Sequence, residues 1–179
     1  MIRYISILRG INVGGHKKIV MANLKVLYKE LGLTNVVTYI QSGNVVFDAK
    51  NDEKPLKLAL MIEQKIKEVY GFEVPIIIRT KEEIGKIVAE SPYVNNEEID
   101  RLYVTFLSQI PSEDRLSIIN EKGFSSDKFE IIGKNIFGYS SGEYSDSKLS
   151  NQFFEIKLKV SATTRNWKTV LKLNELAKK

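Results

Sequence analysis

The first eighty residues alternate between short apolar runs and apolar residues at helical spacing. Runs rich in β-branched and aromatic residues predict four strands, at residues 3–8, 36–41, 44–49 and 74–80. Apolar positions three or four residues apart predict two helices, at residues 21–31 and 56–69. The short Ser42–Gly43 link predicts a hairpin, because glycine supplies a positive φ at little cost. The resulting order, βαββαβ, is that of a ferredoxin-like (split βαβ) unit.

A similar rhythm restarts near residue 99. Residues 91–98, SPYVNNEE, contain a proline and two asparagines and form the best linker candidate. Beyond the linker, the pattern predicts a strand at 100–107, a helix capped by Ser112, a hairpin of 129–132 with 135–139, and helices near 149–156 and 167–176.

We therefore predict an α+β fold of duplicated ferredoxin-like (split βαβ) halves with mainly antiparallel sheets. Residues 1–90 form the first βαββαβ half plus a connecting helix, which Thr80 and Glu83 begin as a capping box. Residues 99–179 form the second α+β half with a C-terminal helix. The repeat is one of element order, because the residues of the two halves do not match.

The composition of the chain limits which partners, metal sites and cellular locations we expect. The chain of 179 residues has 27 basic and 22 acidic residues, and this excess favours an anionic partner weakly, although a generic lysine-rich surface explains it as well. Without cysteine and with one histidine, the chain has no disulfide, thiolate zinc site or multi-histidine metal site, so we expect no metal and no cofactor. No apolar run is long enough for a membrane span and the N-terminus does not fit a secretion signal, so we expect a soluble, cytoplasmic protein with no membrane partner.

The stretch LRGINVGGHKK, residues 8–18, combines three glycines with four basic residues. Glycine-rich loops between a strand and a helix can cradle phosphates with backbone amides. The Walker pattern fails, however, because His16 stands in place of its lysine, and the GxGxxG pattern is absent. Two interpretations stay open: an anion-binding loop, or a mobile connector whose lysines are solvated.

His16 is the one side chain whose ordinary pKa suits proton transfer near neutral pH. A lone loop histidine is more often solvated or a local hydrogen-bond partner. No serine is paired with it by spacing, so a catalytic triad has little support.

The stretch SATTRNWKT, residues 161–169, predicts a helix N-terminus capped by Thr163 or Thr164. The helix dipole disfavours Arg165 in a first turn, yet Arg165 and Asn166 there would suit an anion. Trp167 fits a core anchor, with a ligand-stacking platform as the alternative.

Three segments, LRGINVGGHKKIVMANLK, TYIQSGNVVF and ATTRNWKTVLKL, together resemble the bacterial domain-of-unknown-function family 1697. The resemblance implies a duplicated ferredoxin-like fold and a bacterial, cytoplasmic protein, and it implies no established activity. The stretch GYSSGEYSDSK, residues 138–148, is more acidic and irregular than the family pattern, which puts a basic role for it in doubt.

Our first functional hypothesis is binding of a phosphate-bearing or other anionic ligand: a nucleotide, a nucleic acid or a phosphorylated small molecule. The candidate ligand-binding residues are Arg9, Asn12, Gly14, Gly15, His16, Lys18, Gln41, Ser42, Asn44, Thr164, Arg165, Asn166 and Trp167. In a ferredoxin-like half we expect the first loop and the hairpin turn to lie at opposite ends of the sheet. A shared site would then need the second half or a second subunit, as in a homodimer.

Two alternatives belong to other classes. One is a small enzyme that acts on a phosphorylated or carboxylated metabolite through His16 or Lys18, if either is partly buried beside a carboxylate or hydroxyl. The other is a structural or interaction module whose motifs serve the fold.

Overall fold

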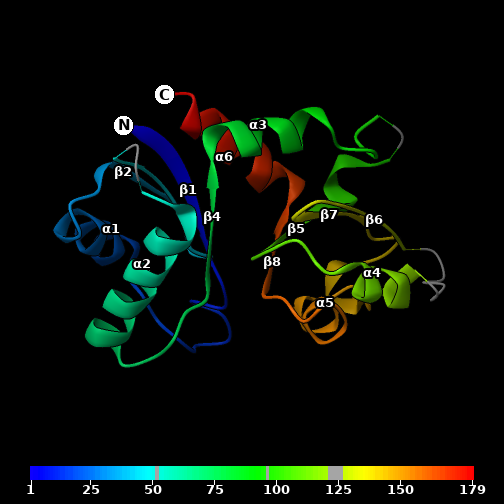
Figure 1. Cartoon of the computed structure of the whole chain (residues 1–179), viewed down its shortest axis with the longest axis horizontal. Coiled ribbons are helices and arrows are strands. Elements are labelled where there is room, and N and C mark those ends of the chain that lie inside the picture. Colours follow the sequence, from blue (N-terminus) through cyan, green and yellow to red (C-terminus); the bar gives the residue numbers. More distant parts are fainter. Residues whose placement is uncertain (51–52, 96, 121–126) are drawn as a thin grey trace. The chain divides into compact units, whose positions relative to one another are not determined.

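The computed structural model describes residues 1–50, 53–95, 97–120 and 127–179 (Figure 1). The chain forms two compact units, which we call unit 1 (residues 1–86 and 172–179) and unit 2 (residues 87–171). Each unit holds one four-stranded antiparallel sheet, and the described residues form six α-helices in all. This is the α+β architecture that the sequence predicts. The predicted boundaries of the halves, 1–90 and 99–179, stay a prediction, and residue 96 of the predicted linker lies outside the described residues.

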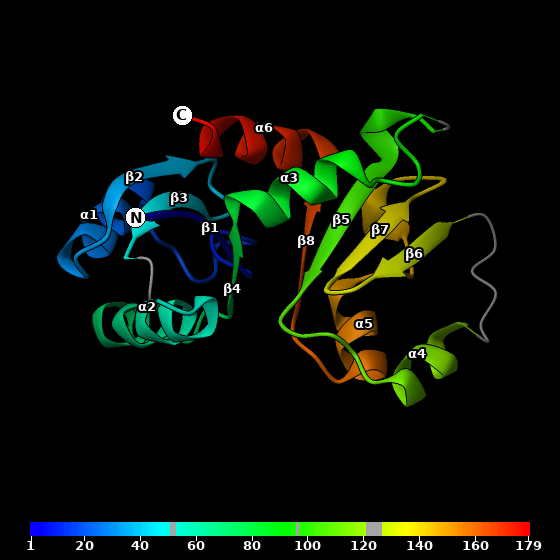
Figure 2. The ribbon, with the colours of Figure 1, turned by 45° about the horizontal axis from the view of Figure 1, so that its top comes forward.

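In unit 1 the sheet has the strand order β2-β3-β1-β4 (Figure 2). The elements are β1 (Ile2–Leu8), α1 (Met21–Glu30), β2 (Thr34–Tyr39), β3 (Asn44–Ala49), α2 (Pro55–Tyr70), β4 (Ile76–Thr80) and the start of α3 (Lys81–Ala89). All four predicted strands and both predicted helices are therefore present. Strand β2 begins two residues earlier than predicted, because Thr34 pairs with Asp48 of β3 across a bulge between Thr34 and Val37.

Helices α1 and α2 cover one face of this sheet and share a hydrophobic core with it. The aromatic centre of the core is Phe47, which stacks on Tyr4 and meets the edge of Tyr28 with ring centroids 5.8 and 5.4 Å apart. The helix ends follow local rules: Gly71, at φ 76°, ends α2, and its N–H donates to Lys67 O. The Thr80–Glu83 capping box is confirmed, since each backbone N–H donates to the other residue's side chain at 2.9 and 3.2 Å.

In unit 2 the sheet has the order β6-β7-β5-β8, the same arrangement as in unit 1 (Figure 2). Its α-helices and strands are β5 (Leu102–Leu107), α4 (Glu113–Asn120), β6 (Lys128–Ile132), β7 (Asn135–Tyr139), α5 (Asn151–Leu158) and β8 (Ala162–Asn166), and α6 (Trp167–Ala177) starts in unit 2 and ends in unit 1. A 3₁₀ turn at Ile99–Arg101 precedes β5, so that strand starts later than predicted, and a second 3₁₀ turn spans Tyr144–Asp146. Helix α5 packs in the core of this unit through Phe154 and Leu158.

One prediction in this region is wrong. Residues 162–166 form strand β8 and not a helix start, because they pair with β5 from Tyr103↔Asn166 to Leu107↔Ala162. Thr163 and Thr164 are therefore strand residues. The cap of α6 is Asn166, whose Oδ1 accepts from Thr169 N at 2.8 Å.

Candidate functional site

The loop after β1 is folded as a small hairpin. Asn12 N donates to Lys17 O at 3.2 Å, and His16 N donates to Val13 O at 3.0 Å. Between them, Gly14 and Gly15 both have positive φ, 56° and 78°, as a tight primed turn requires. The two glycines thus serve the turn, and the loop is an ordered element of unit 1 with its own hydrogen bonds.

The Asn12 side chain joins this loop to the β2–β3 turn. Its Nδ2 donates to Ile19 O and to Gln41 O, both at 2.9 Å, while its Oδ1 accepts from Ile19 N at 2.9 Å. One amide side chain therefore holds together two stretches that are almost thirty residues apart. Asn12 itself has φ 56°, a left-handed conformation that asparagine adopts more readily than most residues.

The expectation that the first loop and the hairpin turn lie at opposite ends of the sheet is wrong. Strands β1 and β3 are antiparallel neighbours, with Ile7 opposite Asn44, so the end of β1 lies beside the start of β3. Leu8 N donates to Gly43 O at 2.9 Å. Convergence of these two motifs needs neither the second half nor a second subunit.

The segment between α2 and β4 reaches the same end of the sheet. Arg9 N donates to Pro75 O at 3.0 Å, and Lys17 Nζ donates to Glu73 O at 2.6 Å. We call this end of unit 1, with its three segments, the loop end.

A shallow hollow of about 400 Å³ opens at the loop end, lined by Asn12, Gly15, Lys18, Ile19, Val20 and Gln41. Four of the predicted site residues are thus brought together: Asn12, Gly15, Lys18 and Gln41. The side chain of Lys18 is exposed, as is that of Gln41, whereas Arg9 is half-buried. Burial lowers the pKa of the Arg9 guanidinium below its ordinary value.

The other predicted residues of unit 1 have different surroundings. His16 is exposed beside the turn glycine Gly14. Asn44 is buried, and its Nδ2 donates to Tyr39 O at 3.1 Å and to Ser42 Oγ at 3.2 Å, so this pair stabilises the hairpin turn.

The third motif belongs to unit 2. Thr164 Oγ1 lies 2.6 Å from Thr105 Oγ1 and donates to Asn151 Oδ1 at 2.7 Å. Arg165 is buried in β8, where its Nη1 donates to Thr164 O at 2.9 Å and burial lowers its pKa to about 10. Trp167 is 1% exposed, as a core anchor is. Whether these residues join the loop end in one site stays a prediction.

Unit 1 has a second hollow, which was not predicted from the sequence. It lies where β1 and β2 begin and β3 and β4 end, away from the loop end, and has a volume of about 730 Å³. Its lining residues are Arg3, Lys25, Lys29, Asn35, Val36, Val37, Asp48, Lys81, Ala177, Lys178 and Lys179. We call it the basic hollow. No motif marks it, because its cations come from four separate segments of the chain.

Two further properties of the described residues concern metal binding and membrane crossing. Within the described ranges, no three histidine, aspartate or glutamate side chains are grouped so that they could hold a metal ion. Of the helices in the described part of the chain, none is long and apolar enough to cross a membrane.

Comparison with known proteins agrees with the sequence resemblance. The sequence model of a family described as protein of unknown function, DUF1697, matches residues 1–137. Among solved structures, the chain is similar to conserved bacterial protein SP0830 from Streptococcus pneumoniae, with a TM-score of 0.77 and 24% identity over 98% of each chain. At this identity the likeness extends to the fold alone. No curated protein matches the sequence.

Proposed function

The chain belongs to domain-of-unknown-function family 1697, and from that premise we propose that its loop end binds a phosphate-bearing or other anionic ligand, either a nucleotide or a nucleic acid. The observation that carries the proposal is the Asn12 amide, which holds the glycine loop and the Gln41 turn around one hollow with Lys18 in its wall.

The groups around this hollow suit a ligand with an anionic part and an apolar or planar part. Lys18 supplies an exposed ammonium group, and Gln41 supplies an exposed amide. Ile19 and Val20 offer apolar surface beside them. Arg9 begins the loop and is half-buried, and it is not one of the residues that line the hollow.

The remaining predictions extend this proposal. We infer a cytoplasmic protein of duplicated ferredoxin-like halves, supported by the shared strand order of the two sheets. We also keep the homodimer, and a contribution of Thr164, Arg165, Asn166 and Trp167 to ligand binding, as proposals. Burial of Arg165 and Trp167 means that a change at either position must be tested for folding before its effect on binding is read.

The test is ligand binding to the whole protein and to a Lys18→Ala variant. A panel of nucleotides and phosphorylated metabolites is screened by thermal shift, and hits are titrated by calorimetry. We expect Lys18→Ala to weaken binding by about ten- to a hundredfold without lowering the melting temperature, since a charge-assisted hydrogen bond contributes about 1.5–3 kcal/mol.

The matched control is Lys54→Ala, which removes the same charge from an exposed side chain. Lys54 lies at the start of α2, about 24 Å of helix away from the segment that follows α2 at the loop end. A panel without any hit, or equal loss of binding in both variants, would contradict the proposal.

The enzyme alternative has less support from the geometry. It needs His16 or Lys18 to be partly buried, and both side chains are exposed. Turnover of a bound metabolite that is lost in His16→Ala, while the metabolite still binds, would favour the enzyme.

A further inference from the structure

The floor of the basic hollow is a polar network on unit 1. Arg3 Nη1 donates to Asp48 Oδ1 at 3.0 Å and to Asn35 O at 3.1 Å. Asn35 Nδ2 donates to the other oxygen of Asp48 at 2.7 Å. Asp48 is the one side-chain carboxylate among the described lining residues, and its charge is balanced by Arg3 in a pair whose side chains are 15% and 16% exposed.

This network also holds an irregular stretch of backbone. Asn35 has φ 48° at the bulge between Thr34 and Val37, a left-handed conformation that asparagine adopts more readily than most residues. Arg3 Nη2 reaches Leu176 O at 3.4 Å, so the last turn of α6 is attached to the same floor. The floor is therefore fixed from four segments of unit 1: β1, β2, β3 and the end of α6.

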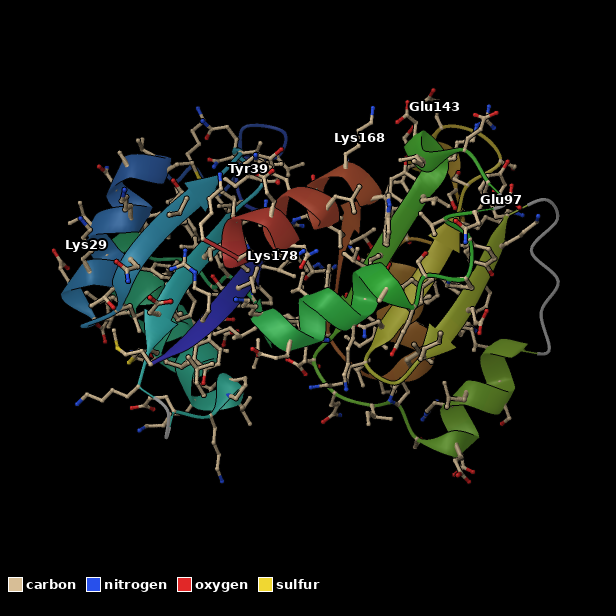
Figure 3. All side chains as sticks on the ribbon, turned by 90° about the horizontal axis from the view of Figure 1, so that it is seen from above. Lys29, Tyr39, Glu97, Glu143, Lys168 and Lys178 are labelled. Carbon is tan, nitrogen blue, oxygen red and sulfur yellow. The ribbon has the colours of Figure 1, made fainter. Side chains whose placement is uncertain are left out.

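Lysines surround this neutral floor. Lys179 pairs with Glu175 at 3.1 Å, but Lys25, Lys29, Lys81 and Lys178 make no ion pair with any residue in the described part of the chain. The four ammonium groups therefore leave an uncompensated positive charge at the hollow. Figure 3 labels Lys29 on α1 and Lys178 just after α6, and both helices border the hollow, as the start of α3 does through Lys81.

Helix stability explains part of this set of lysines and not the rest. Lys29 lies in the last turn of α1 and Lys178 just follows α6, where the helix dipole favours a cation. Lys81, by contrast, is the first residue of α3, where the dipole disfavours a cation. Helix stability therefore does not account for the place of Lys81 in the lining of this hollow.

We propose that the basic hollow binds the phosphate backbone of a nucleic acid. The hollow is open and large, and the described lining residues include no aromatic ring on which a base could stack. Lysine ammonium groups act as point charges without a fixed direction, so they recognise closely spaced phosphates and not a particular base. This site is independent of the loop end, and either proposal can fail without the other.

The test is fluorescence anisotropy of the whole protein with labelled 20-nucleotide single strands and duplexes of unrelated sequence, at several salt concentrations. Four phosphate contacts predict a slope of log K against log salt of about −3 to −4 for duplex DNA. Lys25→Gln, Lys29→Gln and Lys81→Gln should each weaken binding to every sequence alike and reduce the slope by about one. Lys148→Gln, an exposed lysine of unit 2, is the matched control.

Three outcomes would overturn the inference. The first is that the slope and the affinity are unchanged in the three hollow variants, or that they fall by the same amount in Lys148→Gln. The second is that inorganic phosphate or ADP displaces the oligonucleotide at a concentration close to that of the oligonucleotide, which would indicate a site for a small ligand. The third is that anionic lipid vesicles bind through these lysines and oligonucleotides do not bind. Unchanged melting temperatures of the variants ensure that lost binding is not lost folding.

Discussion

At the scale of single residues, Tyr28 makes the free energy of unfolding depend on pH in the alkaline range. Its hydroxyl lies 2.7 Å from Ser6 Oγ in the buried core, and burial raises its pKa above the ordinary value near 10. Above that ordinary value the unfolded chain releases the proton, while folded Tyr28 keeps it. The folded state then binds more protons, so the free energy of unfolding falls as pH rises, by about 1.4 kcal/mol per pH unit for this group.

Tyr28→Phe tests this sign. We expect the variant to be about 1 kcal/mol less stable at pH 7, because Ser6 Oγ loses its shorter hydrogen bond and keeps only the one to Val45 O, and to lose less stability than the parent between pH 10 and 11. Urea unfolding at each pH measures both effects. Tyr39→Phe, at a half-exposed side chain, is the control. Parallel pH profiles for the parent and Tyr28→Phe would refute the assignment.

At the scale of elements, Gly43 sets how closely the hairpin turn approaches the loop after β1. Its φ is 81°, and a Cβ there would lie 2.7 Å from Ile11 Cδ1 and 2.8 Å from Leu8 Cβ. Gly43→Ala should therefore cost about 1–2 kcal/mol of backbone strain plus about 1–3 kcal/mol of overpacking. Thermal and urea unfolding measure the sum.

Gly133→Ala is the matched control for this prediction. Gly133 also has a positive φ, 58°, but nothing lies within 4 Å of its Cβ position. Gly133→Ala should show the backbone cost alone. Equal destabilisation by the two substitutions would mean that the close contacts at Gly43 add no overpacking cost.

Elements with local signals could be predicted from the sequence. The hairpin at Gly43, the helix end at Gly71 and the capping box of Thr80 and Glu83 each depend on residues within a few positions of one another. Strand β8 could not be predicted this way. Its partner β5 lies about sixty residues earlier, and the hydroxyls of Thr163 and Thr164 fit a helix cap equally well.

At the scale of the whole molecule, the sites follow from which strand ends meet. The loop end depends on the antiparallel pairing of β1 with β3. That pairing is non-local, so the prediction from sequence placed the two motifs at opposite ends of the sheet. The basic hollow was invisible for the same reason. Arg3, Lys25, Lys81 and Lys178 carry no common pattern until the sheet and the end of α6 bring them together.

The C-terminal segment completes unit 1 although it follows unit 2 in the chain. Residues 172–179 belong to unit 1, Leu173 and Ala177 in this segment are buried, and Leu176 O accepts from Arg3. Removing residues 172–179 should lower the melting temperature by about 4 °C or more, since one buried leucine contributes about 1.5–3 kcal/mol and each kcal/mol shifts a protein of this size by about 2–4 °C.

Hydrogen exchange locates this loss. After the truncation, amides of β1 should exchange faster relative to the full chain, and more so than amides of β5 in unit 2. A full-length variant with Lys178→Gln and Lys179→Gln removes the charges and keeps the buried leucine, so it should exchange like the parent. Equal acceleration in β1 and β5 would mean that the segment stabilises the chain as a whole and is not a structural part of unit 1.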